Sequence, residues 1–235
     1  MQRDFFRHEL KYFINYFEYQ ILKSKLVHFM DRDSHSDNSG HYHIRSLYFD
    51  DYQNSCLFEK QSGIHSRKKY RIRIYNKKNN LIKLECKSRV GDFIRKQSKK
   101  IDEDLYFKII KNNFDDLILD KNELLNHFYV SLNSNLFRPK VIVDYFREAF
   151  IWQPNNVRIT FDKNLKTGLN AINILEDLTT ISIHENPIMI MEIKYDHFLP
   201  KFINQIISFN AHQRDAISKY VLCRKHTKEN NWEDN

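Results

Sequence analysis

The densest group of chemically active side chains lies between Lys68 and Tyr75. With the two-residue period of a β-strand, Lys69, Arg71 and Arg73 point to one face, and the residues between them are apolar. A strand with one cationic face and one apolar face can bind an anion. For a single strand, an edge position with its charges in water explains the pattern equally well.

A second charged strand follows after a short gap. Lys83, Glu85 and Lys87 share one of its faces, with apolar residues on the other, and residues 76–80 between the two strands predict a hairpin turn. Like charges on paired strands repel unless an anion lies between them. The hairpin therefore predicts a site for an anionic ligand, although Glu85 also allows simple cross-strand ion pairs.

Composition narrows the class of ligand. The chain has 235 residues, of which 41% are hydrophobic and 14% aromatic, so we expect a folded core. The net charge of +8 favours an anionic partner: nucleic acid, a phosphate-rich small molecule or a membrane surface. The four glycines are widely separated, which excludes a P-loop and a dinucleotide fingerprint. Any phosphate must therefore be bound by Lys and Arg side chains.

Three widely spaced cysteines, Cys56, Cys86 and Cys223, predict reduced, buried thiols instead of a disulfide framework or a zinc site. No apolar run approaches the ~20 residues of a transmembrane helix. The first residues lack the apolar region of a signal peptide. We therefore expect a cytoplasmic protein without a transmembrane segment.

Periodicity predicts strands with helices between them. The predicted strands are 7–13, 42–50, 68–75, 82–87, 92–101, 139–152, 157–162 and 188–195. The predicted helices are 16–30, 52–61, 102–112, 121–132, 200–209 and 213–224. A loop is predicted for 31–40, a loop with a short strand for 163–186, and a frayed tail from 225. No repeat, linker or boundary is evident, so we expect one domain over 1–235.

The charged faces allow two architectures. In an open sheet they face water and the helices cover the apolar face, which explains each strand taken alone. In a closed antiparallel barrel the helices pack outside and the charged faces line a lumen. Glu192 favours the lumen, because it interrupts an apolar run and an enclosed carboxylate needs a cation or a metal ion. Many cations with few carboxylates suit a polyanion chelated by one divalent ion.

Eight short motifs occur in order through nearly the whole chain. They are Arg7-x-Glu9-Leu-Lys11-Tyr12, Ser46-Leu-Tyr-Phe-Asp50, Lys69-Tyr-Arg71-Ile-Arg73, Leu84-Glu85-x-Lys87, Tyr145-x-Arg147-x-Ala149, Val157-Arg158-x-Thr160-x-Asp162, Met191-Glu192-x-Lys194 and Ser218-Lys219-Tyr220. Each motif alone is weak, but their shared order is specific. In this order the chain resembles the VTC-type polyphosphate polymerase domain of the CYTH, or triphosphate tunnel, superfamily.

The resemblance implies an α+β fold: a closed antiparallel β-barrel tunnel that holds a phosphate chain, with helices outside and a C-terminal helix at one mouth. It implies a phosphotransferase that moves the γ-phosphate of ATP onto a growing inorganic polyphosphate, with Mn²⁺ or Mg²⁺ as cofactor. ATP and polyphosphate are the expected partners, and no nucleic acid is expected. Eukaryotic relatives work within a membrane complex, so any such coupling here would need a separate membrane protein.

The resemblance also implies roles for individual residues. The expected catalytic residues are Lys11, Arg71, Arg73, Lys87, Arg147 and Lys219. The expected substrate-binding residues are Lys69, Lys96, Tyr145, Arg158, Lys194 and Ser218. Glu192 is the expected metal ligand and Glu9 a second candidate, whereas Glu85 is expected to be an ion-pair partner. Ser98 stands where the family pattern has an arginine after Lys96.

One departure from the superfamily pattern bears on the chemistry. Hydrolytic tunnel enzymes begin with Glu-x-Glu-x-Lys, and here the first position is Arg7. Loss of that carboxylate weakens the case for a two-metal hydrolase and fits transfer to a phosphate acceptor. An inorganic triphosphatase of the same fold remains an alternative. A non-catalytic polyphosphate or nucleic-acid binder is another, although Tyr70 and Phe146 fall on the face opposite the cations, where they cannot stack bases beside them.

Overall fold

The computed structural model describes residues 7–37, 39–64, 66–91, 93–114, 117, 121–184, 188–208 and 216–230. The chain divides into two compact units. Unit 1 comprises residues 1–43, 145–165 and 184–218, and unit 2 comprises residues 44–144, 166–183 and 219–235. The predicted single domain is not tested by this division.

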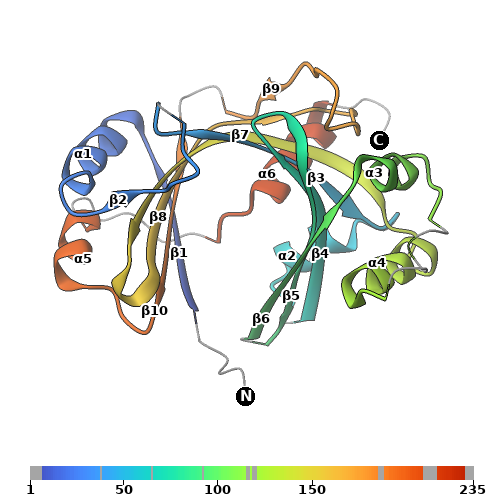
Figure 1. Ribbon diagram of the computed structural model, residues 1–235, viewed down its shortest axis with the longest axis horizontal. Helices are drawn as coiled ribbons and strands as arrows, with labels where there is room; N and C mark the ends of the chain where they lie inside the picture. Colours follow the sequence, from blue (N-terminus) through green and yellow to red (C-terminus); the bar gives the residue numbers. More distant parts are fainter. Residues whose placement is uncertain are drawn as a thin grey trace. The chain divides into compact units, whose positions relative to one another are not determined.

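Unit 1 is an antiparallel sheet covered by helices on one face. Its strands follow the order β1 (Arg7–Ile14), β10 (Met189–Asp196), β8 (Val157–Thr167) and β7 (Arg138–Trp152), and the short β2 (Asp31–Arg32) pairs with β7. Helices α1 (Tyr16–Leu26) and α5 (Lys201–Ile207) lie beside these strands (Figure 1).

Alternation along the strands separates the two faces of the unit 1 sheet. Phe161, Met191 and Ile193 are fully buried in one apolar cluster with Leu26 of α1 and Ile203 of α5. The residues between them on the strands are charged or polar and point to the other face. Burial of the apolar face thus fixes the register, since a slip of one residue would expose it.

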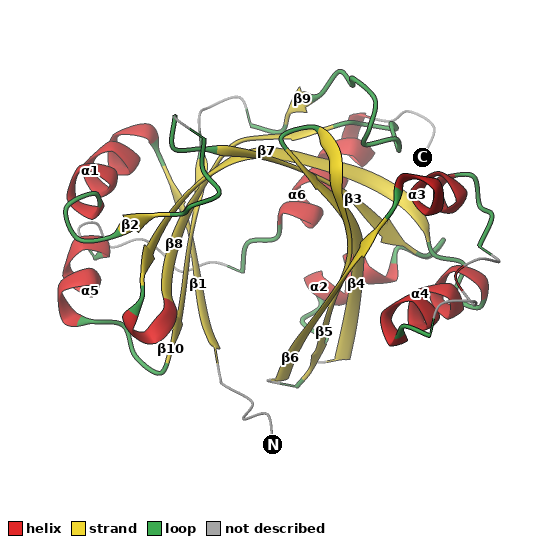
Figure 2. Ribbon diagram, viewed as in Figure 1, coloured by secondary structure: helices red, strands yellow, loops and turns green. Residues whose placement is uncertain are grey.

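Unit 2 contains the sheet β7–β3–β4–β5–β6, in which β3 is Tyr42–Asp50, β4 Ser66–Tyr75, β5 Lys78–Val90 and β6 Phe93–Ile101. The short β9 (Ile181–Ser182) pairs with β8. Among its described residues, this unit has the helices α2 (Ser55–Gln61), α3 (Glu103–Ile110), α4 (Glu123–Asn133) and α6 (Lys219–Asn230). Figure 2 shows α3 and α4 on one face of the β3–β6 strands and α2 on the other.

Aromatic residues form the core on the α4 face of unit 2. Phe128 of α4 contacts Phe49 at 5.1 Å and Tyr70 at 5.0 Å between ring centroids. On the opposite face, the Tyr220 hydroxyl of α6 donates to the buried Asp50 carboxylate, and its ring lies 5.3 Å from that of Tyr48. Helix α6 is therefore held against the charged face of the β3–β4 pair.

The hairpin between β4 and β5 is tighter than the sequence predicted. Its turn is Asn76 and Lys77, both with a left-handed backbone (φ 52° and 54°), and β5 begins at Lys78. Two successive residues with positive φ are what a two-residue hairpin turn requires. The predicted turn over 76–80 was wrong, because three polar residues of the strand resemble turn residues.

Four further expectations were wrong. Residues 31–40 are not all loop, because Asp31 and Arg32 pair with β7, and β8 continues to Thr167 beyond its predicted end at 162. The last helix spans 219–230; residues 216–218 are not helical, and 209–215 lie outside the described residues. Residues 225–230 were expected to fray, but Thr227 is buried and shares a 3.2 Å hydrogen bond with Thr167.

The α+β, antiparallel fold is confirmed, but the closed barrel is not, because the sheet as paired in the described residues is not closed. Closure stays a prediction. The three cysteines are free and buried, as predicted. Among the described residues, no helix has both the length and the apolar character needed to cross a membrane.

Candidate functional site

Strands β4, β5 and β6 of unit 2 place a ladder of cations on one face. Their register aligns four rows: Arg67–Arg89–Ile94, Lys69–Lys87–Lys96, Arg71–Glu85–Ser98 and Arg73–Lys83–Lys100. We call this face the cation ladder. It holds nine cations and one carboxylate, Glu85. Such an excess of like charge on one face disfavours folding unless anions compensate it.

Glu85 partly neutralises the positive charge at the centre of the ladder. Its carboxylate lies 2.6 Å from an Arg71 guanidinium nitrogen, 2.8 Å from Lys96 Nζ and 3.8 Å from Arg73. Burial alone would raise the pKa of Glu85, but the charges of Arg71, Arg73 and Lys96 outweigh it and hold the pKa well below its usual range. The prediction of Glu85 as an ion-pair partner is consistent with these contacts.

Strand β3 orients two of the ladder arginines, Arg71 and Arg73. Arg71 donates to the Tyr48 hydroxyl at 2.8 Å, and Arg73 Nε donates to Ser46 Oγ at 3.0 Å. Tyr48 is buried, which would raise its pKa, yet the two guanidinium groups lower it. Neither Ser46 nor Tyr48 was among the predicted site residues, although the Ser-Leu-Tyr-Phe-Asp motif carries both.

Helix α6 brings two more predicted residues to this face. Lys69 Nζ lies 4.8 Å from the centre of the Tyr220 ring, a cation–π contact. The ammonium of Lys219 also contributes to lowering the Tyr48 pKa, so Lys219 is near the same hydroxyl. Unit 2 therefore groups six of the predicted residues around β3, β4, β5, β6 and α6: Lys69, Arg71, Arg73, Lys87, Lys96 and Lys219.

Unit 1 carries a second group of predicted residues, on the face opposite its apolar cluster. Arg147 of β7 makes a bidentate ion pair with Asp162 of β8, at 2.6 and 2.8 Å, and lies 3.8 Å from Glu192 of β10. Burial opposes its charge, but Asp162, Tyr145 and Glu192 raise the pKa of Arg147 well above the usual range. Arg147 is therefore a permanently charged group held by two strands.

Four charges alternate across β1 and β10. Glu9 lies opposite Lys194, and Lys11 opposite Glu192. Lys11 Nζ is 2.7 Å from Glu9, and Lys194 Nζ is 2.7 Å from Glu192. Burial lowers the pKa of Lys194, against the pull of Glu192 and Glu9. The enclosure predicted for Glu192 is confirmed, since it is 5% exposed.

Another ion pair of unit 1 joins the predicted residue Arg158 to Asp33, which was not among the predicted site residues. Arg158 of β8 lies 2.6 Å from the Asp33 carboxylate and donates to the Tyr42 hydroxyl at 2.9 Å. Asp33 is 5% exposed and lies in the segment predicted as a polar loop. Only the pairing of β2 with β7 brings this carboxylate to the sheet, so no local signal could have identified it.

Two predicted residues complete the unit 1 group. Tyr145 is 3% exposed, with the Arg147 guanidinium 5.4 Å from its ring centre. Lys11 donates to the Ile217 carbonyl at 3.4 Å, which brings the segment containing Ser218 beside β1. The other unit 1 members of the predicted set are Glu9, Arg158, Glu192 and Lys194.

The carboxylates of the unit 1 group decide whether a divalent ion could be held there. Within the described ranges, no three His, Cys, Asp or Glu residues form a metal-binding group. The chain therefore offers no all-protein cage there. Mg²⁺ is commonly held by one or two carboxylates together with substrate phosphates. Glu192, with Glu9 on the neighbouring strand, fits that arrangement.

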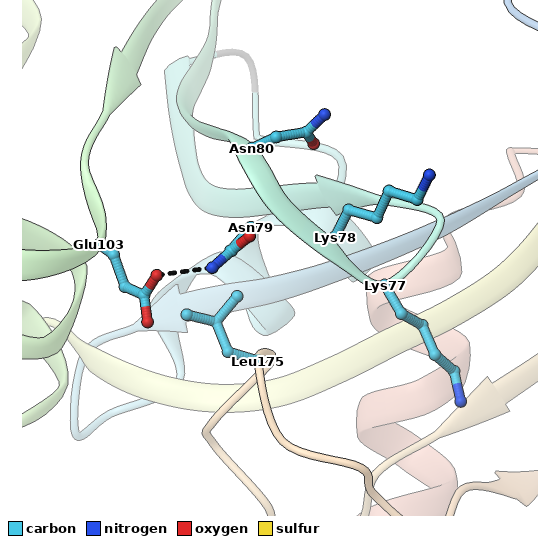
Figure 3. Close-up of a pocket in the computed structure, with 6 residues that line it drawn as sticks. All are labelled: Lys77, Lys78, Asn79, Asn80, Glu103 and Leu175. Atoms are coloured by element: carbon cyan, nitrogen blue, oxygen red, sulfur yellow. Dashed lines mark hydrogen bonds between the residues drawn. The ribbon is translucent and has the colours of Figure 1, made fainter.

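A separate pocket of about 430 Å³ opens at the tip of the β4–β5 hairpin (Figure 3). It is lined by Lys77, Lys78, Asn79, Asn80, Glu103 and Leu175, and Asn79 donates to Glu103 at 2.8 Å. None of the predicted site residues lines it. Its mixed lining gives no grouping of the predicted site residues, so we place the candidate site on the charged strand faces.

Two solved structures are similar to this chain. A Bacillus halodurans protein described as a "putative adenylate cyclase" is similar with 11% identity over 86% of this chain and 88% of its own, at a TM-score of 0.50. The PH1819 protein of Pyrococcus horikoshii OT3 has 15% identity over 86% of this chain and 84% of its own, at 0.43. At these identities the likeness concerns the fold alone. A comparison with curated proteins found no match.

The family comparison is more direct. The model of the VTC domain matches residues 6–228, which include nearly all of both units and every predicted site residue. The match begins before the Glu9 motif and ends within α6, so it contains all the paired strands described above. The chain therefore belongs to the VTC domain family.

Proposed function

We propose that this protein is a metal-dependent polyphosphate polymerase, which transfers the γ-phosphate of ATP to a growing inorganic polyphosphate chain. The observation that carries the proposal is the cation ladder, with nine cations and one buried carboxylate on three adjacent strands. A linear polyanion of phosphates supplies the missing negative charge along the strands. Membership in the VTC domain family supports the same assignment.

Arg71 and Arg73 are proposed to hold the phosphates that react. Their fixed partners Ser46 and Tyr48 hold both guanidinium groups in place before a ligand arrives. Charge that develops on phosphate oxygens during transfer is then met by groups that need no reorganisation. Lys87, Lys96 and Lys219 add charge beside them, and Lys69 lies in the same row as Lys87.

The unit 1 group has a different proposed part. Four cations are each held in place by a carboxylate partner: Arg147, Arg158, Lys11 and Lys194. They are proposed to bind phosphate oxygens with the N–H groups that do not contact the carboxylate. Tyr145 and Ser218 are proposed to donate to phosphate oxygens. No general base is required, because a terminal phosphate is already an anionic nucleophile.

A divalent ion, Mn²⁺ or Mg²⁺, is proposed to be held by Glu192 and Glu9 together with the phosphates. When bound, it would neutralise phosphate charge and orient the γ-phosphate. Glu192→Gln keeps the shape but removes the charge. We expect metal-dependent turnover to be lost and Mn²⁺ binding, followed by paramagnetic relaxation, to weaken at least about tenfold, with the fold retained. Unchanged Mn²⁺ binding would remove Glu192 from the metal site.

The reaction is tested by phosphorus NMR of the products after incubation with ATP and Mn²⁺. We expect ADP and long acid-labile chains, with free orthophosphate a minor product, and a lag that added short polyphosphate shortens. Orthophosphate formed one-for-one with ADP, without chains, would identify a triphosphatase instead. No turnover with any divalent ion, but tight polyphosphate binding, would identify a non-catalytic binder.

A further inference from the structure

Asp50, at the end of β3, is a fully buried carboxylate outside the set of proposed site residues. Its oxygens accept hydrogen bonds from the backbone N–H groups of Cys56 at 2.8 Å and Leu57 at 3.2 Å, in the first turn of α2. Asn54, the N-cap residue of that helix, makes no capping hydrogen bond with its own side chain. Asp50 therefore takes over the cap, and the start of α2 fixes the position of its carboxylate.

Helix α6 supplies a further donor to the same carboxylate. Helices α2 and α6 lie side by side (Figure 1), and the Tyr220 hydroxyl of α6 donates to Asp50. Burial raises the pKa of Tyr220 far above its ordinary value of 10, and the charge of Asp50 and the hydrogen bond to it raise the pKa further. The hydroxyl therefore keeps its proton and is occupied by Asp50. Because it is not available to a substrate, Tyr220 can act on the reaction only through its position.

The ring of Tyr220 contacts the cation ladder and one of its partners. Lys69 Nζ lies 4.8 Å from the ring centre, and the ring of Tyr48 lies 5.3 Å away. Tyr48 in turn accepts a hydrogen bond from Arg71 at 2.8 Å, and the charge of Lys219 acts on the Tyr48 hydroxyl. A shift of Tyr220 would thus displace a ladder lysine, the tyrosine that orients Arg71, and the adjacent Lys219.

We propose that Asp50 is a positioning residue for phosphoryl transfer. Through the Tyr220 hydroxyl, its carboxylate sets where α6 holds Lys219 and Lys69 against the ladder. The inference rests on the proposed function and adds to it a residue that contacts no phosphate. Misplacement of a reacting group by about 1 Å can cost about 100-fold in rate, so a buried anchor beside the site affects the rate without touching the substrate.

A second anchor on the same helix provides the control. About two turns further along α6, Thr227 shares a 3.2 Å hydrogen bond with Thr167, and both residues are buried. Neither threonine is a proposed site residue. Tyr220→Phe removes one hydroxyl and keeps the ring that contacts Lys69 and Tyr48, whereas Thr227→Val removes one hydroxyl from the second anchor. Each variant breaks a buried hydrogen bond that docks α6, and only the first bond lies beside the ladder.

The experiment measures kcat and KM for ATP in the chain-forming reaction, together with thermal unfolding and amide hydrogen exchange along α6. For Tyr220→Phe we expect kcat to fall at least about tenfold while KM rises less than about threefold, because the displaced charges act mainly in the transition state. For Thr227→Val we expect faster exchange in α6 but a kcat within about twofold of the parent. Adding Asp50→Asn to Tyr220→Phe should lower kcat little further, since both changes break one bond.

Three results would overturn the inference: a parental kcat for Tyr220→Phe, an equal fall of kcat in both single variants, or a rise in KM with kcat unchanged. If Asp50→Asn does not fold, the comparison of the two single variants decides alone. Failure of the proposed function is a separate result, since a parent that forms only orthophosphate, or no product, would contradict the polymerase. The inference is then decided by tripolyphosphate affinity, and an affinity of Tyr220→Phe equal to that of Thr227→Val would overturn it.

Discussion

The two charged faces of this protein use the same residue types with different balance. In unit 1, Lys11, Arg147, Arg158 and Lys194 are each paired with their own carboxylate at 2.6–2.7 Å. In unit 2, the nine cations of the ladder lie on strand faces that carry one carboxylate, Glu85, which contacts Arg71, Arg73 and Lys96. Balanced pairs stabilise the fold in the absence of a ligand. An unbalanced ladder stores repulsion that a bound anion relieves, so net charge per face, not the number of arginines, marks the stronger anion site.

The largest effect should come from breaking a balanced pair. Asp162→Asn leaves the Arg147 guanidinium, only 12% exposed, without its bidentate partner. Removal of one partner of a buried pair costs about 3–5 kcal/mol, because the other charge stays buried. We expect the free energy of unfolding in urea to fall by about that amount. A loss below about 1 kcal/mol would mean that Glu192 alone, at 3.8 Å, compensates Arg147.

Glu85→Gln tests the unbalanced face. It leaves Arg73, which is 8% exposed, and Arg71 without their carboxylate, and we expect a loss of about 3 kcal/mol at low salt. Tripolyphosphate should restore more stability to this variant than it adds to the parent, because phosphate takes over the carboxylate's charge. Urea unfolding with and without the ligand measures this. Equal stabilisation of both proteins would show that the ligand does not replace the negative charge of Glu85.

The same carboxylate predicts a dependence on pH. The pKa of Glu85 in the folded protein is below its ordinary value of 4.5, so its stabilisation is complete above that value and is lost as pH falls through the folded pKa. The parent should therefore lose stability below about pH 4.5 more steeply than Glu85→Gln does. Thermal unfolding of both proteins between pH 3 and 6 is the measurement, and parallel curves would contradict the assignment.

The smallest effect is expected at an exposed pair. Arg95 lies on the face of β6 opposite the ladder and contacts Glu123 at 2.9 Å, with both side chains more than half exposed. Exposed ion pairs contribute little to stability. Arg95→Ala should leave the urea midpoint and tripolyphosphate affinity unchanged. A clear loss of affinity would show that cations on both faces of β6 act on the ligand. The ligand would then not be bound by the ladder face alone.

Much of the site could be predicted because it depends on local alternation. Arg71 and Arg73 share a face by the period of the strand alone, and the apolar run around Glu192 predicted its burial. The same local signals misplaced the start of β5, since Lys78 and two asparagines resemble a turn. They also placed the last helix too early, because the contact of Thr227 with Thr167 stabilises a segment whose own composition is polar.

The residue order alone decides which side chains share a strand face, because the pleat alternates with a fixed period of two and burial of the apolar face prevents slippage. The composition decides the net charge, and the wide spacing of the four glycines excludes a glycine-based phosphate cradle. The partners of those side chains were decided only in three dimensions. Asp33 reaches Arg158 across 125 positions, and Tyr220 reaches Asp50 across 170. Such pairs depend on strand order and helix docking, which no local pattern encodes, and they determine which cations are already neutralised and which remain available to an anionic ligand.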